Sequence, residues 1–184
     1  TQPLSAYGAS KLAGTVLIEE ALRTGKVKVA ALRLTNPIGA GIGAGTLPGR
    51  AVREIFDAAQ TNQPAVQFGP LGAKRDFIDS RDVARAVAHA IEHQLTGVIN
   101  VGSGEARPVR DLVTELVKLA GYQGQISESA AGSPRSSDVP YQKADMSLLF
   151  STGFELQYTF SDTLLSLYHS VSNSLQTEST QTPA

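Results

Sequence analysis

Apolar residues recur at helical spacing in one stretch of the chain and form a nearly continuous run in the next. This change of pattern marks the first two elements. Over residues 4–24 they recur three and four positions apart, which is the spacing of an amphipathic helix that ends at Gly25. The next run, VKVAALRL over residues 27–34, is apolar at nearly every position, as in a strand buried on both faces of a parallel sheet. The pattern therefore predicts a helix followed by a parallel strand.

The rest of the chain continues this alternation. Further helices are predicted over residues 50–60, in SRDVARAVAHAIEH, in VRDLVTELVKLAG and over residues 160–175, and a short helix begins in ADMSLLF. Short strands are predicted at AVQF and RDFI, and a stronger strand at GVINVGSG. The alternation predicts an α/β fold with helices on both faces of a sheet.

Two segments, residues 27–34 and 98–101, are the strong strand candidates for the central sheet. Because a doubly wound sheet has several parallel strands, we expect residues 1–175 to hold the C-terminal part of a Rossmann-type sheet and a small α/β lobe. Residues 176–184 (QTESTQTPA) are too polar to pack, and we expect a disordered tail there.

Composition and charge exclude several classes of function. The 184 residues carry 16 basic and 17 acidic side chains, a net charge of −1, so the chain has no electrostatic footprint for a nucleic acid. No apolar run approaches the roughly 20 residues that span a bilayer, so no membrane partner is expected. The absence of cysteine fits a reducing compartment, and we expect a cytoplasmic protein.

The segment PLSAYGASKLAG contains a candidate catalytic pair. In a helix, Tyr7 and Lys11 lie one turn apart on the same face. A phenol needs a pKa shift of about 3 units, or roughly 4 kcal/mol, to act as a base at neutral pH. An ammonium about 6 Å away contributes roughly 2.8 kcal/mol at an effective dielectric of about 20, so Lys11 alone falls short. The alternative is a surface helix on which the two side chains are merely neighbours.

Two other patterns resemble a cofactor-binding loop and a metal site, and both have a simpler interpretation. GAGIGA, residues 39–44, fits G-x-G-x-x-A after a strand, but GTLPG intervenes where the pyrophosphate-binding helix must begin. We interpret it as a loop. His89 and His93 lie one helical turn apart without thiolates or an evident third ligand, so we expect no metal site and a solvated helix face.

Four blocks, YGASK, LRLTNPIGAG, RDFIDSRDVARAV and NVGSGE, occur in an order and spacing that resemble the extended short-chain dehydrogenase/reductases. They are most similar to the NAD-dependent nucleotide-sugar epimerases and dehydratases, and NPIGA resembles the UDP-galactose 4-epimerase version of its motif. The resemblance implies NAD, or NADP, as cofactor. It also implies that Tyr7 exchanges a proton with a sugar hydroxyl and that Lys11 donates to the nicotinamide ribose.

The resemblance also implies substrate-binding residues. Asn36 stands where the family bonds the phosphate region, although an Asx turn before Pro37 is an equal alternative. Arg75 and Arg135 stand where the family's arginines meet the pyrophosphate, for which a planar guanidinium is suited. Asp76 is expected to brace the loop rather than to react.

The predicted function is that of an NAD-dependent nucleotide-sugar epimerase, dehydratase or reductase, present here as its C-terminal portion. The N-terminal NAD-binding half is expected to be absent and to act in cis or in trans, and a homodimer is possible. Two alternatives stay open: a stand-alone binding or interaction domain without redox activity, and an extended short-chain reductase of a non-sugar substrate.

Overall fold

The computed structural model describes residues 2–131 and 139–180. The helices are α1 (Ala6–Arg23), α2 (Leu47–Gln60), α3 (Ser80–Glu92), α4 (Val109–Ala120), α6 (Ser147–Ser151) and α7 (Phe160–Thr180). The strands are β1 (Ala30–Leu34), β2 (Asn36–Ile38), β3 (Ala65–Gln67), β4 (Lys74–Asp79), β5 (Gly97–Val101), β6 (Ala106–Pro108) and β7 (Gln125–Ser127). The predicted α/β class is confirmed.

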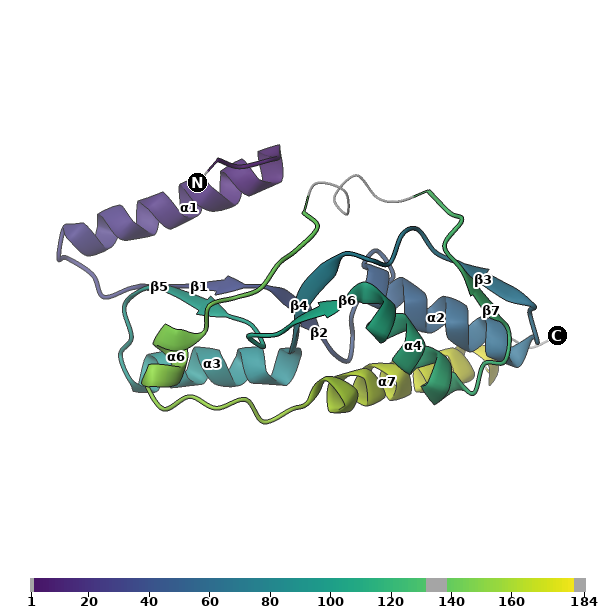
Figure 1. The fold of residues 1–184 in the computed structure, drawn as a ribbon. Helices are drawn as coiled ribbons and strands as arrows, with labels where there is room; N and C mark the ends of the chain where they lie inside the picture. Colours follow the sequence, from purple (N-terminus) through teal and green to yellow (C-terminus); the bar gives the residue numbers. More distant parts are fainter. Residues whose placement is uncertain (1, 132–138, 181–184) are drawn as a thin grey trace.

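The strands form three small sheets. β1 pairs with β5 in parallel, from Ala30 opposite Gly97 to Leu34 opposite Val101, so the two strong strand candidates of the sequence are partners. α1 lies over one face of this pair and α3 under the other (Figure 1). The second sheet has the order β2–β4–β6, parallel at β2–β4 and antiparallel at β4–β6, and the third is a parallel β3–β7 pair.

Two apolar cores lie on either side of β4. The larger one joins α2, α4 and α7, and Phe68, Leu112 and Leu164 are fully buried in it. The smaller one joins β5, α3 and α6 around Ile99 and Leu149. Figure 1 shows the same division, with α1, α3 and α6 around the β1–β5 pair and α2, α4 and α7 beside β3 and β7.

Two helix boundaries, the start of α2 and the end of α7, differ from the sequence prediction. α2 begins at Leu47 rather than at residue 50, because the Thr46 hydroxyl accepts from the Gly49 amide at 3.2 Å and caps the helix. α7 runs to Thr180, five residues beyond the predicted end, so the predicted disordered tail is helical over residues 176–180. No Gly or Pro stands in α7 to end it earlier. Residues 181–184 lie outside the described residues.

A buried carboxylate, Asp76 of β4, connects four segments of the chain. It is fully buried and accepts hydrogen bonds from the amides of Ser103, Gly104 and Ala144 at 2.6, 3.1 and 2.9 Å, and from the Ser103 hydroxyl at 2.8 Å. The Thr35 hydroxyl lies 3.3 Å from the same carboxylate. The predicted role of Asp76 as a brace is confirmed.

Asp79 and Asp82 extend this arrangement to the start of α7. Asp79 caps α3, pairs with Arg81 at 2.7 Å and accepts from the Thr163 hydroxyl at 2.9 Å. Asp82 is fully buried, pairs with Arg85 at 2.6 Å and accepts from the amides of residues 157 and 158. The three aspartates therefore join β4 and α3 to segments that are distant in sequence.

Within the described part of the chain, no helix combines the length and the apolar character needed to cross a lipid bilayer.

Replacing Asp76 by Asn should lower the free energy of unfolding by about 2–4 kcal/mol, because an amide NH₂ would then face buried N–H donors. Chemical denaturation measures the change. Asp57→Asn, at an exposed carboxylate of α2, is the matched control and should stay within about 0.5 kcal/mol of the wild type. Equal stability of Asp76→Asn and Asp57→Asn would contradict the role given to Asp76.

The stability of the protein should also depend on the ionisation of Asp79. Burial raises the pKa of this carboxyl, but its hydrogen bonds from Arg81 and Thr163 and the Arg81 charge outweigh burial, so its pKa lies below the ordinary value. The ionised form is then favoured in the folded state. Its stabilisation is complete above the unfolded pKa of about 3.9 and is lost as the pH falls through the lower folded pKa.

Urea denaturation from pH 7 down to pH 2 tests this expectation. The loss of stability on acidification should be smaller in Asp79→Asn than in the wild type, whereas Glu19→Gln, at an exposed carboxyl of α1, should follow the wild-type curve. A wild-type acid dependence in Asp79→Asn would show that this carboxyl does not contribute.

Candidate functional site

Tyr7 and Lys11 lie on the first turns of α1, as the sequence predicted. The Lys11 ammonium is 5.3 Å from the centroid of the Tyr7 ring, and 66% of Tyr7 is exposed. The Ser10 hydroxyl donates a hydrogen bond to the Tyr7 carbonyl at 2.8 Å, so its proton is engaged by the backbone of the same helix. The phenol and the ammonium therefore reach the same solvent-accessible region.

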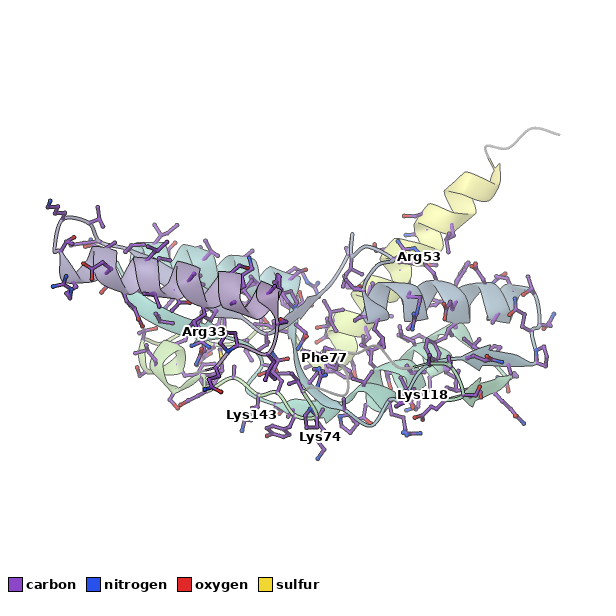
Figure 2. All side chains as sticks on the ribbon, turned by 90° about the horizontal axis from the view of Figure 1, so that it is seen from above. Arg33, Arg53, Lys74, Phe77, Lys118 and Lys143 are labelled. Atoms are coloured by element: carbon purple, nitrogen blue, oxygen red, sulfur yellow. The ribbon has the colours of Figure 1, made fainter. Side chains whose placement is uncertain are left out.

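The start of α1 is fixed by a cap. The Ser5 hydroxyl accepts from the Gly8 amide at 3.1 Å, which begins the helix at Ala6, one residue before the tyrosine. α1 contacts β1 and β5, yet none of its residues is buried. Both views place its first turns at the end of the sheet where β1 finishes (Figures 1 and 2). This carboxyl end is where open α/β sheets bind ligands.

Asn36 connects three segments at the same end of the sheet. Its side-chain nitrogen donates to the Asp76 carbonyl at 2.8 Å and to the Gln142 side chain at 2.7 Å. The amide therefore ties β2 to β4 and to the segment after residue 138. Sequence reasoning missed Gln142, which lies 106 positions from Asn36, and no local spacing signals such a contact.

Arg75 is half-buried on β4, one residue before the Asp76 brace. Its guanidinium donates to the Lys74 carbonyl at 2.9 Å, and burial lowers its pKa from the ordinary value. Arg107 of β6 stands directly opposite in the antiparallel register, but it forms an ion pair with Glu105. A cation taken partly out of water is stabilised by an anion, so Arg75 suits a phosphate group.

Two lysines that the sequence analysis did not single out lie on β4 and on the segment that pairs with its start. Tyr141 forms a bridge with Lys74, and the Gln142 amide donates to the Lys74 carbonyl at 3.1 Å, which brings Lys143 next to Lys74. Figure 2 shows both lysines on the same face of the molecule. Because side chains alternate along a strand, Lys74 lies on the face of β4 opposite to Arg75. Arg135, the other predicted phosphate-binding arginine, lies outside the described residues.

GAGIGA forms a loop, as the sequence analysis predicted. α2 begins only at Leu47, after the Thr46 cap, so no helix N-terminus directly follows residues 39–44. Arg53 of α2 donates to the Ile42 carbonyl at 3.5 Å and so connects the loop to the helix. The loop does not fit the pyrophosphate of a dinucleotide, which needs helix amides immediately after the glycines.

His89 and His93 make local contacts on α3. Their rings stack with centroids 3.9 Å apart, and the His89 Nε2 lies 2.8 Å from the Thr152 hydroxyl oxygen. Across residues 2–131 and 139–180, no three His, Cys, Asp or Glu side chains gather in a way that could hold a metal ion. The pair connects α3 to the end of α6.

Two known enzymes are similar to this chain over most of its length. A dTDP-6-deoxy-L-talose 4-dehydrogenase (NAD(P)(+)) from Kitasatospora kifunensis is 33% identical over 149 residues, which are 79% of this chain and 46% of that protein. A GDP-6-deoxy-D-mannose reductase from Pseudomonas aeruginosa is 27% identical over 88% of this chain and 54% of its own length. The chain thus spans about half the length of these relatives.

Solved structures share the fold. The structure of RMD from Pseudomonas aeruginosa complexed with NADPH superposes with a TM-score of 0.84 at 24% identity, over 94% of this chain and 57% of that chain. MoeE5 in complex with UDP-glucose and NAD gives a TM-score of 0.76 at 28% identity, over 95% of this chain and 57% of that chain. The sequence pattern of the NAD dependent epimerase/dehydratase family matches residues 1–102. This chain therefore belongs to the NAD dependent epimerase/dehydratase family.

Proposed function

We propose that this chain supplies the proton-transfer pair and the sugar-nucleotide site of an NAD(P)-dependent epimerase, dehydratase or reductase. The observation that carries the proposal is the placement of Tyr7 and Lys11, adjacent and exposed on the first turns of α1, at the carboxyl end of β1. Because the chain spans about half of its relatives, the remaining cofactor-binding part acts in cis or in trans.

Tyr7 is the proton-transfer residue in this proposal. Its phenol oxygen takes the proton from a sugar hydroxyl as the carbon that carries it is oxidised, or returns a proton to the sugar carbonyl oxygen as that carbon is reduced. NAD(P), when bound, would accept the hydride from the sugar carbon or supply it. Lys11 and Tyr7 fit the nicotinamide ribose because both are exposed hydrogen-bond donors.

The substrate is proposed to be a nucleotide sugar bound through its diphosphate. Half-buried Arg75 offers positive charge next to Asp76, near the carboxyl ends of β1 and β5, and Arg135 is proposed as a further phosphate ligand. Asn36 orders this region through Asp76 and Gln142. The complex of the 28%-identical MoeE5 with UDP-glucose supports this class of substrate. An apolar substrate would leave the charge of Arg75 without a counter-ion, which is costly.

Tyr7→Phe should lower turnover by about 10² to 10⁴ in the completed enzyme, because it removes the proton-carrying oxygen and keeps the ring. Turnover of a dTDP-sugar is followed by NAD(P)H absorbance, in a protein joined to the N-terminal part of the Kitasatospora kifunensis dehydrogenase. Tyr141→Phe, at another exposed tyrosine, is the control and should keep wild-type turnover. Undiminished turnover of Tyr7→Phe would remove the catalytic assignment.

Arg75→Ala should weaken the binding of dTDP or UDP by one to two orders of magnitude, about 1.5 to 3 kcal/mol for lost charge-assisted bonds. Calorimetric titration of the 184-residue chain measures this effect. Arg107→Ala is the matched control, because Arg107 lies opposite Arg75 and its charge is already paired with Glu105. If Arg75→Ala and the wild type bind equally, or if neither binds, the nucleotide-sugar assignment fails.

A further inference from the structure

The segment of residues 141–146 turns alternate side chains to opposite sides. Its even-numbered residues are half-buried or buried, and its odd-numbered residues are exposed. On the inner side, the Gln142 side chain accepts from Asn36 at 2.7 Å. The Ala144 amide donates to the buried Asp76 carboxylate at 2.9 Å. Because neighbouring side chains of an extended segment point in opposite directions, the odd-numbered ones face away from the proposed substrate site.

An open hollow of about 520 Å³ lies on this outer side. Its volume is within the range of small-molecule sites, about 300–1,000 Å³. Two of its lining residues, Ala144 and Met146, are buried. Two others, Tyr141 and Phe150, are aromatic and remain 56% and 43% exposed. Two accessible aromatic rings at one hollow favour a ligand that has a ring of its own, because such rings stack or meet edge to face.

Lys143 and Asp145 place opposite charges in the same hollow. Across residues 2–131 and 139–180, the Lys143 ammonium has no hydrogen-bond partner. Oδ1 of Asp145 accepts from the Ser147 amide at 3.0 Å and from its hydroxyl at 2.6 Å, whereas Oδ2 has no hydrogen bond within the described chain. The bonds from Ser147, together with the Lys143 charge, hold the pKa of the Asp145 carboxyl below its ordinary value, so this group is ionised at neutral pH.

The two charges restrict the chemistry of the ligand. They stand two residues apart on the same side of the extended segment. An anion alone would meet the Asp145 carboxylate, and a cation alone would meet the Lys143 ammonium. A zwitterion satisfies both groups, because its carboxylate accepts from Lys143 and its ammonium donates to Oδ2 of Asp145. An aromatic ring and a pair of opposite charges occur together in the aromatic amino acids.

We propose that this hollow binds a free aromatic amino acid in its zwitterionic form. The ring of the ligand packs against Tyr141 and Phe150, and its charged groups pair with Lys143 and Asp145. The site is separate from the proposed nucleotide-sugar site, which Gln142 faces from the other side of the same segment. The inference goes beyond the proposed function and does not depend on it.

Titration of the isotope-labelled 184-residue chain with L-phenylalanine, followed by NMR of the backbone amides, tests the site. Saturable shifts are expected for residues 141–150 and Gly104, and none for Tyr7. Phenylpropionate lacks the ammonium and phenylethylamine lacks the carboxylate, so each should bind at least about fivefold more weakly. L-Alanine keeps both charges without the ring and should bind about tenfold more weakly.

Variants of the lining residues test the individual contacts. Lys143→Gln should weaken the binding of L-phenylalanine by about fivefold, and Phe150→Ala by about tenfold. Lys118→Gln, at an exposed lysine of α4, and Leu148→Ala, at an exposed leucine of α6 outside the hollow, are the matched controls and should bind like the wild type. Tyr141→Phe keeps the ring and should also bind like the wild type.

Four outcomes would overturn the proposal. They are the absence of saturable binding, equal binding of an analogue that lacks one charge, wild-type binding by both Lys143→Gln and Phe150→Ala, and displacement of L-phenylalanine by dTDP. The last outcome would place the ligand in the proposed nucleotide-sugar site instead. Because no arm measures turnover or uses an Arg75 variant, these outcomes are distinguishable from failure of the Tyr7 and Arg75 assignments.

Discussion

The buried carboxylate of Asp76 is the constraint on which the site depends. Four hydrogen bonds to it fix the turn after β5 and the segment at Ala144 against β4, and a buried charge without such donors would be unstable. Position 102 must also be glycine, because a Cβ there would come within 2.7 Å of the Asp76 carboxylate. Asn36 bonds the carbonyl of the same residue, and Arg75 precedes it in the strand. The residues proposed to bind the substrate are therefore positioned by the brace.

The proposed proton-transfer pair is held in a different way. α1 has a well-formed cap but no buried residue, so its attachment to the β1–β5 pair rests on half-buried contacts. Helices gain most of their stability from packing an apolar face. The placement of Tyr7 and Lys11 thus depends on the contacts that α1 makes with β1 and β5.

Much of the fold could be predicted because its longer elements carry clear periods. The helices at 4–24 and from Ser80 and the parallel partners at 27–34 and 98–101 follow from apolar spacing alone. The three-residue strands β2, β6 and β7 could not be predicted, since they exist only through their partners. The contact of Asn36 with Gln142 is a tertiary contact without a local signal. The end of α7 was missed because polarity was taken to mean disorder, whereas a helix without Gly or Pro can continue.

The motif RDFIDSRDV holds both the proposed anion-binding arginine and the structural brace because side chains alternate between the two faces of β4. Phe77 packs into the larger core and Ile78 into the smaller one, so successive residues of β4 point to opposite sides. Asp76 therefore turns to the brace while Arg75, its neighbour, turns to the other face opposite Arg107. A shift of one residue in the pairing of β4 would expose the carboxylate and bury the guanidinium. The burial of Asp76 and the accessibility of Arg75 are consequently one structural requirement, and the hydrogen bonds that stabilise the fold also fix the face on which an anion can bind.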